Sequence, residues 1–115
     1  MIQRYVTNAR LSRLVIHNGV AYVAGTGPDT ATASAGEQTK EVLRKIDDFL
    51  TQAKTDRSKL LSATVWVKDL EDLSEINEVW DAWLPSGCAP ARSCVQATPA
   101  RSDFALAITV TAAIA

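Results

Sequence analysis

Arg92 is the residue whose type and position most directly suggest chemistry. It lies in the stretch PSGCAPARSCVQAT, residues 85–98, between Cys88 and Cys94 and at the start of a segment that reads as extended. A guanidinium presents a planar fork of N–H donors that matches a carboxylate or a phosphate. Pro90 stiffens the approach, so less entropy is lost when a ligand orders the loop. The two interpretations are an anion anchor at the edge of a sheet and a surface arginine paired with an acidic neighbour.

Two further side chains could take part in chemistry. Cys94 invites a nucleophile hypothesis, but no base lies near it in the sequence, because the single histidine, His17, is far away. We therefore expect a buried, inert strand cysteine. Asn77 follows Ile76 at the edge of an apolar helix stripe, where an amide needs a hydrogen-bond partner. That partner is either backbone or, alternatively, the nearby loop or a ligand.

The composition indicates a single cytosolic domain over residues 1–115, of which 47% are apolar. Twelve basic and thirteen acidic residues leave a charge of −1, which gives no footprint for nucleic acid or a membrane surface. No segment has the length of a membrane-spanning helix, and the N-terminus lacks a signal-peptide core. A reducing cytosol disfavours a disulfide between Cys88 and Cys94. We expect no metal, since one histidine and two thiols make no convincing zinc site. AGTGP has the wrong spacing for a phosphate loop.

The N-terminal segment predicts strands joined by a hairpin. Residues 2–6 alternate in polarity, and two apolar runs, 14–16 and 20–23, flank Asn18 and Gly19. Asn-Gly between two apolar runs is the signature of a type I′ turn, because both turn positions need a positive φ. We therefore expect three strands before the first helix.

Two amphipathic helices follow, the first after a small, turn-rich loop over residues 24–36. Ser34 with Glu37 three residues later fits a capping box, and Asp69 or Asp72 is placed to cap the second helix. The apolar positions of both helices recur at helical spacing. They are Val42, Leu43, Ile46, Phe49, Leu50 and Ala53 in the first helix, and Leu73, Ile76, Trp80, Trp83 and Leu84 in the second.

Three more strands complete the chain, over residues 60–70, 92–98 and 104–115, with a turn over residues 99–103. Residues 63–67 are almost all apolar, so we expect both faces of that strand to be covered. The resulting order is β-β-β-α-β-α-β-β. It predicts an α+β domain with one mixed sheet and two helices on one face.

The last strand indicates how the sheet face that carries no helices is covered. One side of it is apolar and the other is made of small, mild residues, a surface that a second subunit often covers. We therefore expect an oligomer. The apolar side carries Leu106, Ile108 and Val110, and the mild side carries Ala105, Ala107, Thr109 and Thr111.

Three segments together resemble a known family. The order of elements and the stretches VAYVAGTGP, LLSATVWVKDLEDLSEINEVWDAW and PARSCVQ are similar to those of the RidA/YjgF family of reactive-intermediate deaminases. The resemblance covers nearly the whole chain. It implies a chorismate-mutase-like fold and a homotrimer with a cleft between each pair of subunits. It also implies hydrolysis of small 2-imino acids or their enamine tautomers to 2-oxo acids and ammonia, with no metal or organic cofactor.

The resemblance also assigns roles to residues. The family arginine that binds the substrate carboxylate falls on Arg92, and Cys94 offers mainly backbone groups to the ligand. Asn77 and Gly25 complete the set of substrate-binding residues that the family implies. The partner is then a small carboxylate, with neither nucleic acid nor a membrane.

Two departures from the family pattern affect the chemistry. The glutamate that positions water in typical members is replaced by Ala107, and a tyrosine before the first hairpin is replaced by Leu11. Gln96 and Asp103 are the available substitutes, but strand parity disfavours both. Either another group activates water, or the substrate differs, or this member binds without catalysing. An activity on nucleic acid, proposed for relatives, conflicts with the charge balance.

Overall fold

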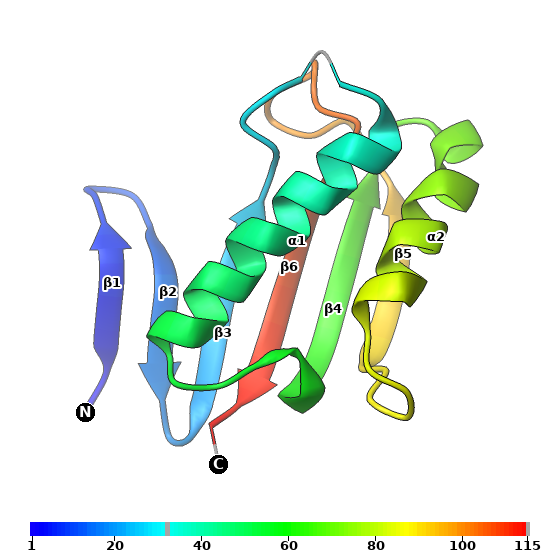
Figure 1. The fold of residues 1–115 in the computed structure, drawn as a ribbon. Coiled ribbons are helices and arrows are strands. Elements are labelled where there is room, and N and C mark those ends of the chain that lie inside the picture. Colours follow the sequence, from blue (N-terminus) through cyan, green and yellow to red (C-terminus); the bar gives the residue numbers. More distant parts are fainter. Residues whose placement is uncertain (32, 115) are drawn as a thin grey trace.

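The computed structural model describes residues 1–31 and 33–114, and the predicted order of elements is confirmed. Two helices lie on one face of a single sheet (Figure 1). The elements are β1 (Gln3–Thr7), β2 (Ser12–His17), β3 (Val20–Thr26), α1 (Ala35–Gln52), β4 (Leu60–Val67), α2 (Leu73–Trp83), β5 (Ala91–Gln96) and β6 (Leu106–Ala113), with 3-10 turns η1 (Arg57–Lys59) and η2 (Leu70–Asp72). Neither described helix is long and apolar enough to cross a membrane.

The sheet has six strands in the order β1-β2-β3-β6-β4-β5. All neighbouring strands are antiparallel except β4 and β5. That pair is parallel because α2 carries the chain back along the sheet between them, as a crossover must. The last strand, β6, lies in the middle of the sheet, and β5 forms an edge (Figure 1). Arg92 therefore lies at the start of an edge strand, which is one of the two interpretations that the sequence left open.

Local signals fixed the turn and the start of the first helix. Asn18 and Gly19 have φ angles of 50° and 74°, which confirms the hairpin. The Ser34 hydroxyl accepts a hydrogen bond of 3.2 Å from the backbone N–H of Glu37, so Ser34 caps α1. For α2 the prediction holds only in part, because Asp72 occupies the N-cap position without a capping hydrogen bond from its side chain.

Neither Asp69 nor Asp72 makes a capping hydrogen bond through its side chain. The reason is that η2 runs directly into α2. The backbone N–H of Leu73 therefore donates to the carbonyl of Leu70, and the turn supplies an acceptor that a cap would otherwise provide. The same turn ends β4 at Val67, earlier than residue 70.

The core lies between the sheet and the helices, on one face only. Along β6 the predicted side, from Leu106 to Val110, is at most 1% exposed. The expectation that both faces of β4 are covered is not met within one chain. Ala63, Val65 and Val67 are buried under the helices, whereas Trp66 is 36% exposed on the opposite, open face. Alternation in β4 was hidden because Trp66 is apolar as well.

Gln38 connects two long loops, the one between β3 and α1 and the one between β5 and β6. Its side chain is 4% exposed. Its Nε2 donates to the carbonyls of Ala31 (3.2 Å) and Ala33 (2.9 Å), and its Oε1 accepts from the N–H of Ala105 (2.9 Å). The first loop is also fastened at Asp29, whose pKa is lowered by a hydrogen bond from Lys45.

Replacing Gln38 by Leu should lower the free energy of unfolding by about 1–3 kcal/mol, because the N–H of Ala105 would lose its buried partner. Urea denaturation at a fixed protein concentration measures this. Gln52→Leu is the matched control, since Gln52 lies on the same helix and is exposed. Equal losses in the two variants would contradict the role of Gln38.

Candidate functional site

Arg92, Asn77 and Cys94 lie together at the edge of the sheet. In the parallel ladder Arg92 pairs with Ala63 and Cys94 with Val65, so both side chains point to the helix face. The Arg92 Nη2 donates to Oδ1 of Asn77 (2.7 Å) and to Sγ of Cys94 (3.3 Å). The amide of Asn77 thus finds its partner in a side chain of β5, directly after the loop that the sequence offered as one alternative.

The guanidinium of Arg92 is held from a second side by Trp80. Its Cζ lies 5.1 Å from the centroid of the Trp80 ring, within the range of a cation–π contact. Trp80 is 2% exposed and lies three residues after Asn77, hence on the same face of α2. The Arg92 Nε is buried and has no hydrogen-bond partner among the described residues. A hollow of about 260 Å³ is lined by Leu73, Asn77, Arg92 and Cys94.

The thiol of Cys94 is exposed, so the prediction of a buried cysteine is wrong. The reason is topological: β5 is an edge strand, and every residue in it except Arg92 is exposed. His17 lies on β2, four strand positions away and therefore roughly 19 Å across the sheet. Within one chain it cannot act as a base for Cys94. Cys88 and Cys94 are both free thiols.

Gly25 and Ala107 lie apart from this cluster. A Cβ added to Gly25 would lie 3.6 Å from the Thr109 hydroxyl oxygen, on the open face. Ala107 pairs with Trp66 on that same face. The strand β6 is two positions from β5, or roughly 10 Å, and the sheet separates the two faces. One chain therefore brings together three of the six positions that the resemblance singled out, namely Arg92, Asn77 and Cys94.

The other positions considered from the sequence are also remote from Arg92 or already engaged. Leu11 is exposed between β1 and β2, at the opposite edge of the sheet. The Gln96 amide donates to the carbonyl of Lys68 at 3.5 Å. Asp103 pairs with Arg101 at 2.9 Å, and that hydrogen bond lowers the pKa of its carboxyl group. Neither Gln96 nor Asp103 replaces the missing acid within one chain.

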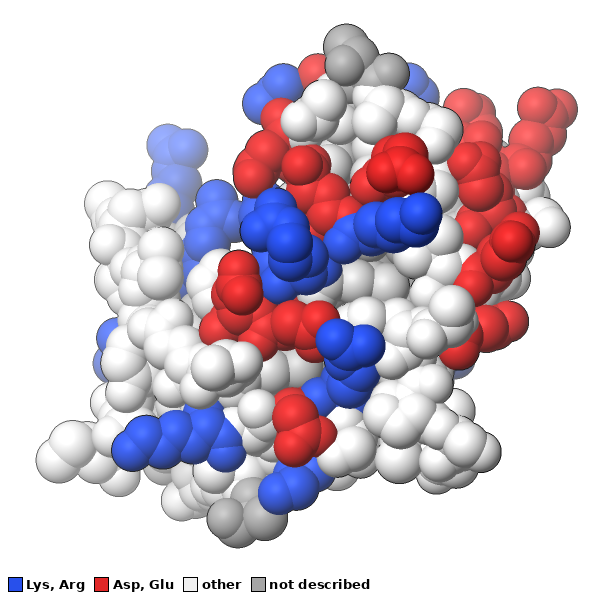
Figure 2. Space-filling model, in the orientation of Figure 1, with Lys and Arg blue, Asp and Glu red and all other residues white. Residues whose placement is uncertain are grey.

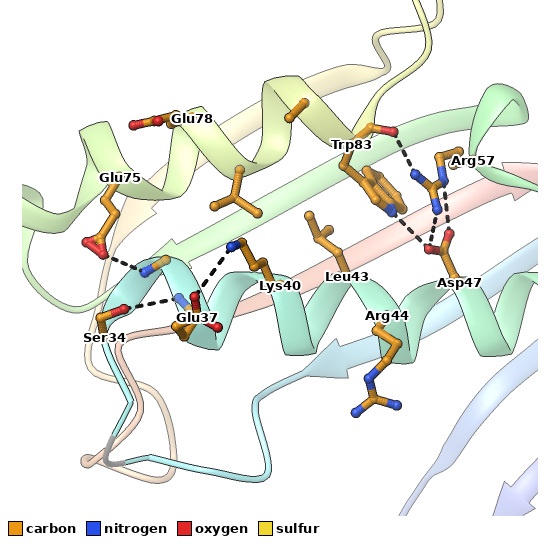
Figure 3. A pocket seen from close by; sticks show the side chains of 13 residues that line it. Ser34, Glu37, Lys40, Leu43, Arg44, Asp47, Arg57, Glu75, Glu78 and Trp83 are labelled. Carbon is orange, nitrogen blue, oxygen red and sulfur yellow. Dashed lines mark hydrogen bonds and ion pairs between the residues drawn. The ribbon is translucent and has the colours of Figure 1, made fainter.

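A larger hollow, of about 610 Å³, lies between α1 and α2 (Figure 3). At one end the Arg57 Nε and Nη2 bind the Asp47 carboxylate at 3.2 and 2.5 Å, and its Nη1 donates to the Trp83 carbonyl at 2.9 Å. The indole N–H of Trp83 donates to Asp47 at 3.0 Å. At the other end Glu75 accepts from the N–H of Gly36 at 2.8 Å.

This groove between the helices was missed by the sequence analysis. Its hydrogen-bonded network joins Asp47 of α1, Arg57 of η1 and Trp83 of α2. No local sequence pattern connects these three residues. Although the groove is the larger hollow, both of its ion pairs are internal: Arg57 pairs with Asp47 and Lys40 with Glu37. The Arg92 hollow instead holds a cation that no acidic side chain pairs among the described residues. We therefore take the Arg92 cluster as the candidate site.

The site does not resemble a metal centre. Among residues 1–31 and 33–114, no three His, Cys, Asp or Glu side chains lie close enough to hold a metal ion. What the cluster offers is an arginine fixed in orientation, an exposed thiol and an apolar wall formed by Leu73. These groups suit a small anion with an apolar part.

Fold and site together define a small α+β protein with an arginine at the edge of a single sheet that no acidic side chain of the described residues pairs. The family model described as "Endoribonuclease L-PSP" matches residues 1–114. A "RutC family protein" of Haemophilus ducreyi is 39% identical over 114 residues, which are 99% of this chain and 97% of that protein. The crystal structure of a member of the YjgF protein family from Neisseria meningitidis has a TM-score of 0.96 at 36% identity, covering 100% and 96% of the two chains. This chain belongs to the RidA/YjgF family.

One curated relative carries a functional name. "Reactive Intermediate Deaminase A, chloroplastic" of Arabidopsis thaliana is 30% identical over 95 residues, which are 80% of this chain and 49% of that protein. The family confirms the resemblance seen in the sequence and the mixed α+β fold.

Asp47→Ala should lower the free energy of unfolding by about 1.5–3 kcal/mol, because the Arg57 guanidinium loses its carboxylate partner. The low end is expected, since both side chains are partly exposed. Asp48→Ala is the control, because Asp48 is 76% exposed and lies 3.9 Å from Arg44. It should change stability by less than about 0.5 kcal/mol. If urea denaturation gives the same free energy of unfolding for both variants, the contacts of Asp47 with Arg57 and Trp83 do not stabilise the fold.

Proposed function

We propose that this protein binds a small 2-imino carboxylate through Arg92 and hydrolyses it to the 2-oxo acid and ammonia. The observation that carries the proposal is the Arg92 guanidinium, oriented by Asn77 and Trp80 and paired with no acidic side chain of the described chain. A carboxylate is the natural partner of such a cation. Membership of the RidA/YjgF family and the name of the Arabidopsis relative support the reaction.

The reaction demands little from the protein. A protonated imine is a strong electrophile that hydrolyses unaided: water adds to the imine carbon, and the C–N bond breaks as ammonia leaves. The protein must hold the substrate in one orientation and leave access for one water molecule. An arginine bound to the carboxylate supplies the orientation. The chain's own residues can do this without a metal or an organic cofactor.

A homotrimer with sites between subunits is part of the proposal. The open face of the sheet exposes Tyr22 (46%), Trp66 (36%) and Val95 (39%), and these aromatic and apolar side chains favour a covering subunit. The positions of Gly25 and Ala107 on that face also support it. They contribute to the same pocket as Arg92 only if a neighbouring copy brings them there.

A second candidate function is carboxylate binding without hydrolysis. It is favoured by Ala107, because a methyl group cannot polarise the water that attacks the imine. An activity on RNA, which the name of the family model suggests, draws less support from this chain. On the helix face Lys and Arg alternate with Asp and Glu and form no continuous basic patch (Figure 2).

Arg92→Ala should weaken binding of pyruvate, a 2-oxo acid product, by about ten- to a hundredfold, since a hydrogen-bonded charge contact contributes about 1.5–3 kcal/mol. Arg92→Lys should also bind more weakly, because a point charge cannot replace the planar donors. Titration followed by NMR gives the affinities, and light scattering verifies that each variant keeps the parent's oligomeric state. Unchanged binding by Arg92→Ala would refute the anchor, and a monomeric parent would refute the intersubunit site.

Ala107→Glu should accelerate hydrolysis of 2-iminopropanoate made in situ. A positioned general base contributes about 10²–10⁴-fold, and an introduced one should reach only the low end. Ala113→Glu is the matched control, since Ala113 lies on the same strand and the same face, further from Trp66. No gain over the parent, in a variant with the parent's assembly, would mean that position 107 does not face the substrate.

A further inference from the structure

The donors of Arg92 are unevenly used. A guanidinium has five N–H groups: one on Nε and two on each terminal nitrogen. Both hydrogens of Nη2 have acceptors, at Asn77 and Cys94. The Nε is buried without a partner, and Nη1 makes no hydrogen bond within the described residues. A ligand therefore meets an arginine whose Nη1 is free and whose Nη2 is already hydrogen-bonded to the protein.

The two contacts of Nη2 differ in strength. The amide oxygen of Asn77 is a good acceptor at 2.7 Å, whereas a thiol is a weak one, and the Cys94 sulfur lies at 3.3 Å. Cys94 is also exposed and lines the hollow. A carboxylate that binds across both terminal nitrogens takes the hydrogen now given to Cys94 and leaves the bond to Asn77 intact.

Asn77 is a neutral residue on a helix, α2, whose exposed side is strongly acidic. Acidic residues cover the outer side of η2 and α2, along the right-hand edge of the molecule (Figure 2). None of them forms an ion pair with Arg92. The α2 side chain that hydrogen-bonds to the guanidinium, Asn77, is neutral. These acidic residues are Glu71, Asp72, Glu75, Glu78 and Asp81.

We propose that Asn77 is a positioning residue that also sets the specificity of the site for anions. Its amide oxygen holds Nη2 without neutralising the guanidinium, and the Trp80 ring fixes the plane of the group from the other side. The positive charge stays available for one carboxylate, which binds end-on. The inference rests on the proposed function only in taking the ligand to be a small carboxylate.

Asn77→Asp tests the inference, because it keeps the size and the hydrogen bond while adding one negative charge. Its carboxylate would pair with Nη2, so pyruvate should bind roughly tenfold more weakly or worse. The melting temperature should be unchanged or higher, because Arg92 gains an ion pair. A residue with a purely structural role would instead lose binding and stability together.

Two variants complete the design. Ser74→Asp adds the same charge at an exposed position one turn away on α2, and it should bind pyruvate within about threefold of the parent, since exposed charges are screened. Asn77→Ala removes the acceptor without adding charge, and its affinity should fall between those of the parent and Asn77→Asp. The inference is overturned if Asn77→Asp binds like the parent, if Ser74→Asp loses as much, or if Asn77→Ala binds no better than Asn77→Asp.

These measurements separate the inference from the proposed function. Pyruvate binding requires no turnover. If the parent hydrolyses no imine but the three variants keep the expected order, hydrolysis is refuted and the role of Asn77 stands. If the parent hydrolyses imines and Asn77→Asp still binds pyruvate normally, only the role of Asn77 is refuted.

Discussion

The parallel pairing of β4 and β5 is the constraint on which the candidate site depends. Arg92 stands beside Ala63 and Cys94 beside Val65, so both point toward α2. A slip of one residue would turn both to the open face and place Ser93 beneath the helix. The crossover through α2 makes the two strands parallel, and the same helix supplies Asn77 and Trp80. The segment that makes the strands parallel therefore also builds the surroundings of the arginine.

The two faces of the sheet have different chemistry. Under the helices β6 is fully apolar, whereas its open side carries hydroxyl groups that bond to neighbouring strands. Ser62 and Thr111 hydroxyls lie 2.6 Å apart, and the Trp66 indole reaches the Thr109 hydroxyl at 3.4 Å. Side chains that satisfy one another leave less need for water. Such a face suits burial against another copy of the chain. In the proposed trimer, this contact brings Gly25 and Ala107 of one copy to Arg92 of a neighbouring copy.

The two hollows of the molecule differ in how completely their charges are matched. In the groove between the helices Arg57 donates to Asp47 and to the Trp83 carbonyl, and the network closes on itself. At the sheet edge Arg92 meets an amide and a thiol, neither of which neutralises it. A closed network braces helices, whereas an open one can exchange a weak internal contact for a ligand. Size alone would have selected the groove between the helices.

The sequence by itself determined the order of the elements and singled out Arg92 as the proposed anion anchor. Asn18-Gly19, Ser34 with Glu37, and the apolar periods of both helices are local signals, because turn angles, caps and repeats depend on residues a few positions apart. Arg92 was identified by its type and by its place at the start of a strand. Only the tertiary structure decided that Asn77 holds it, that Cys94 is exposed, and that Gly25 and Ala107 lie on the other face. Those facts depend on strand order, on register and on the rotation of α2, which are set by contacts between residues far apart in the chain.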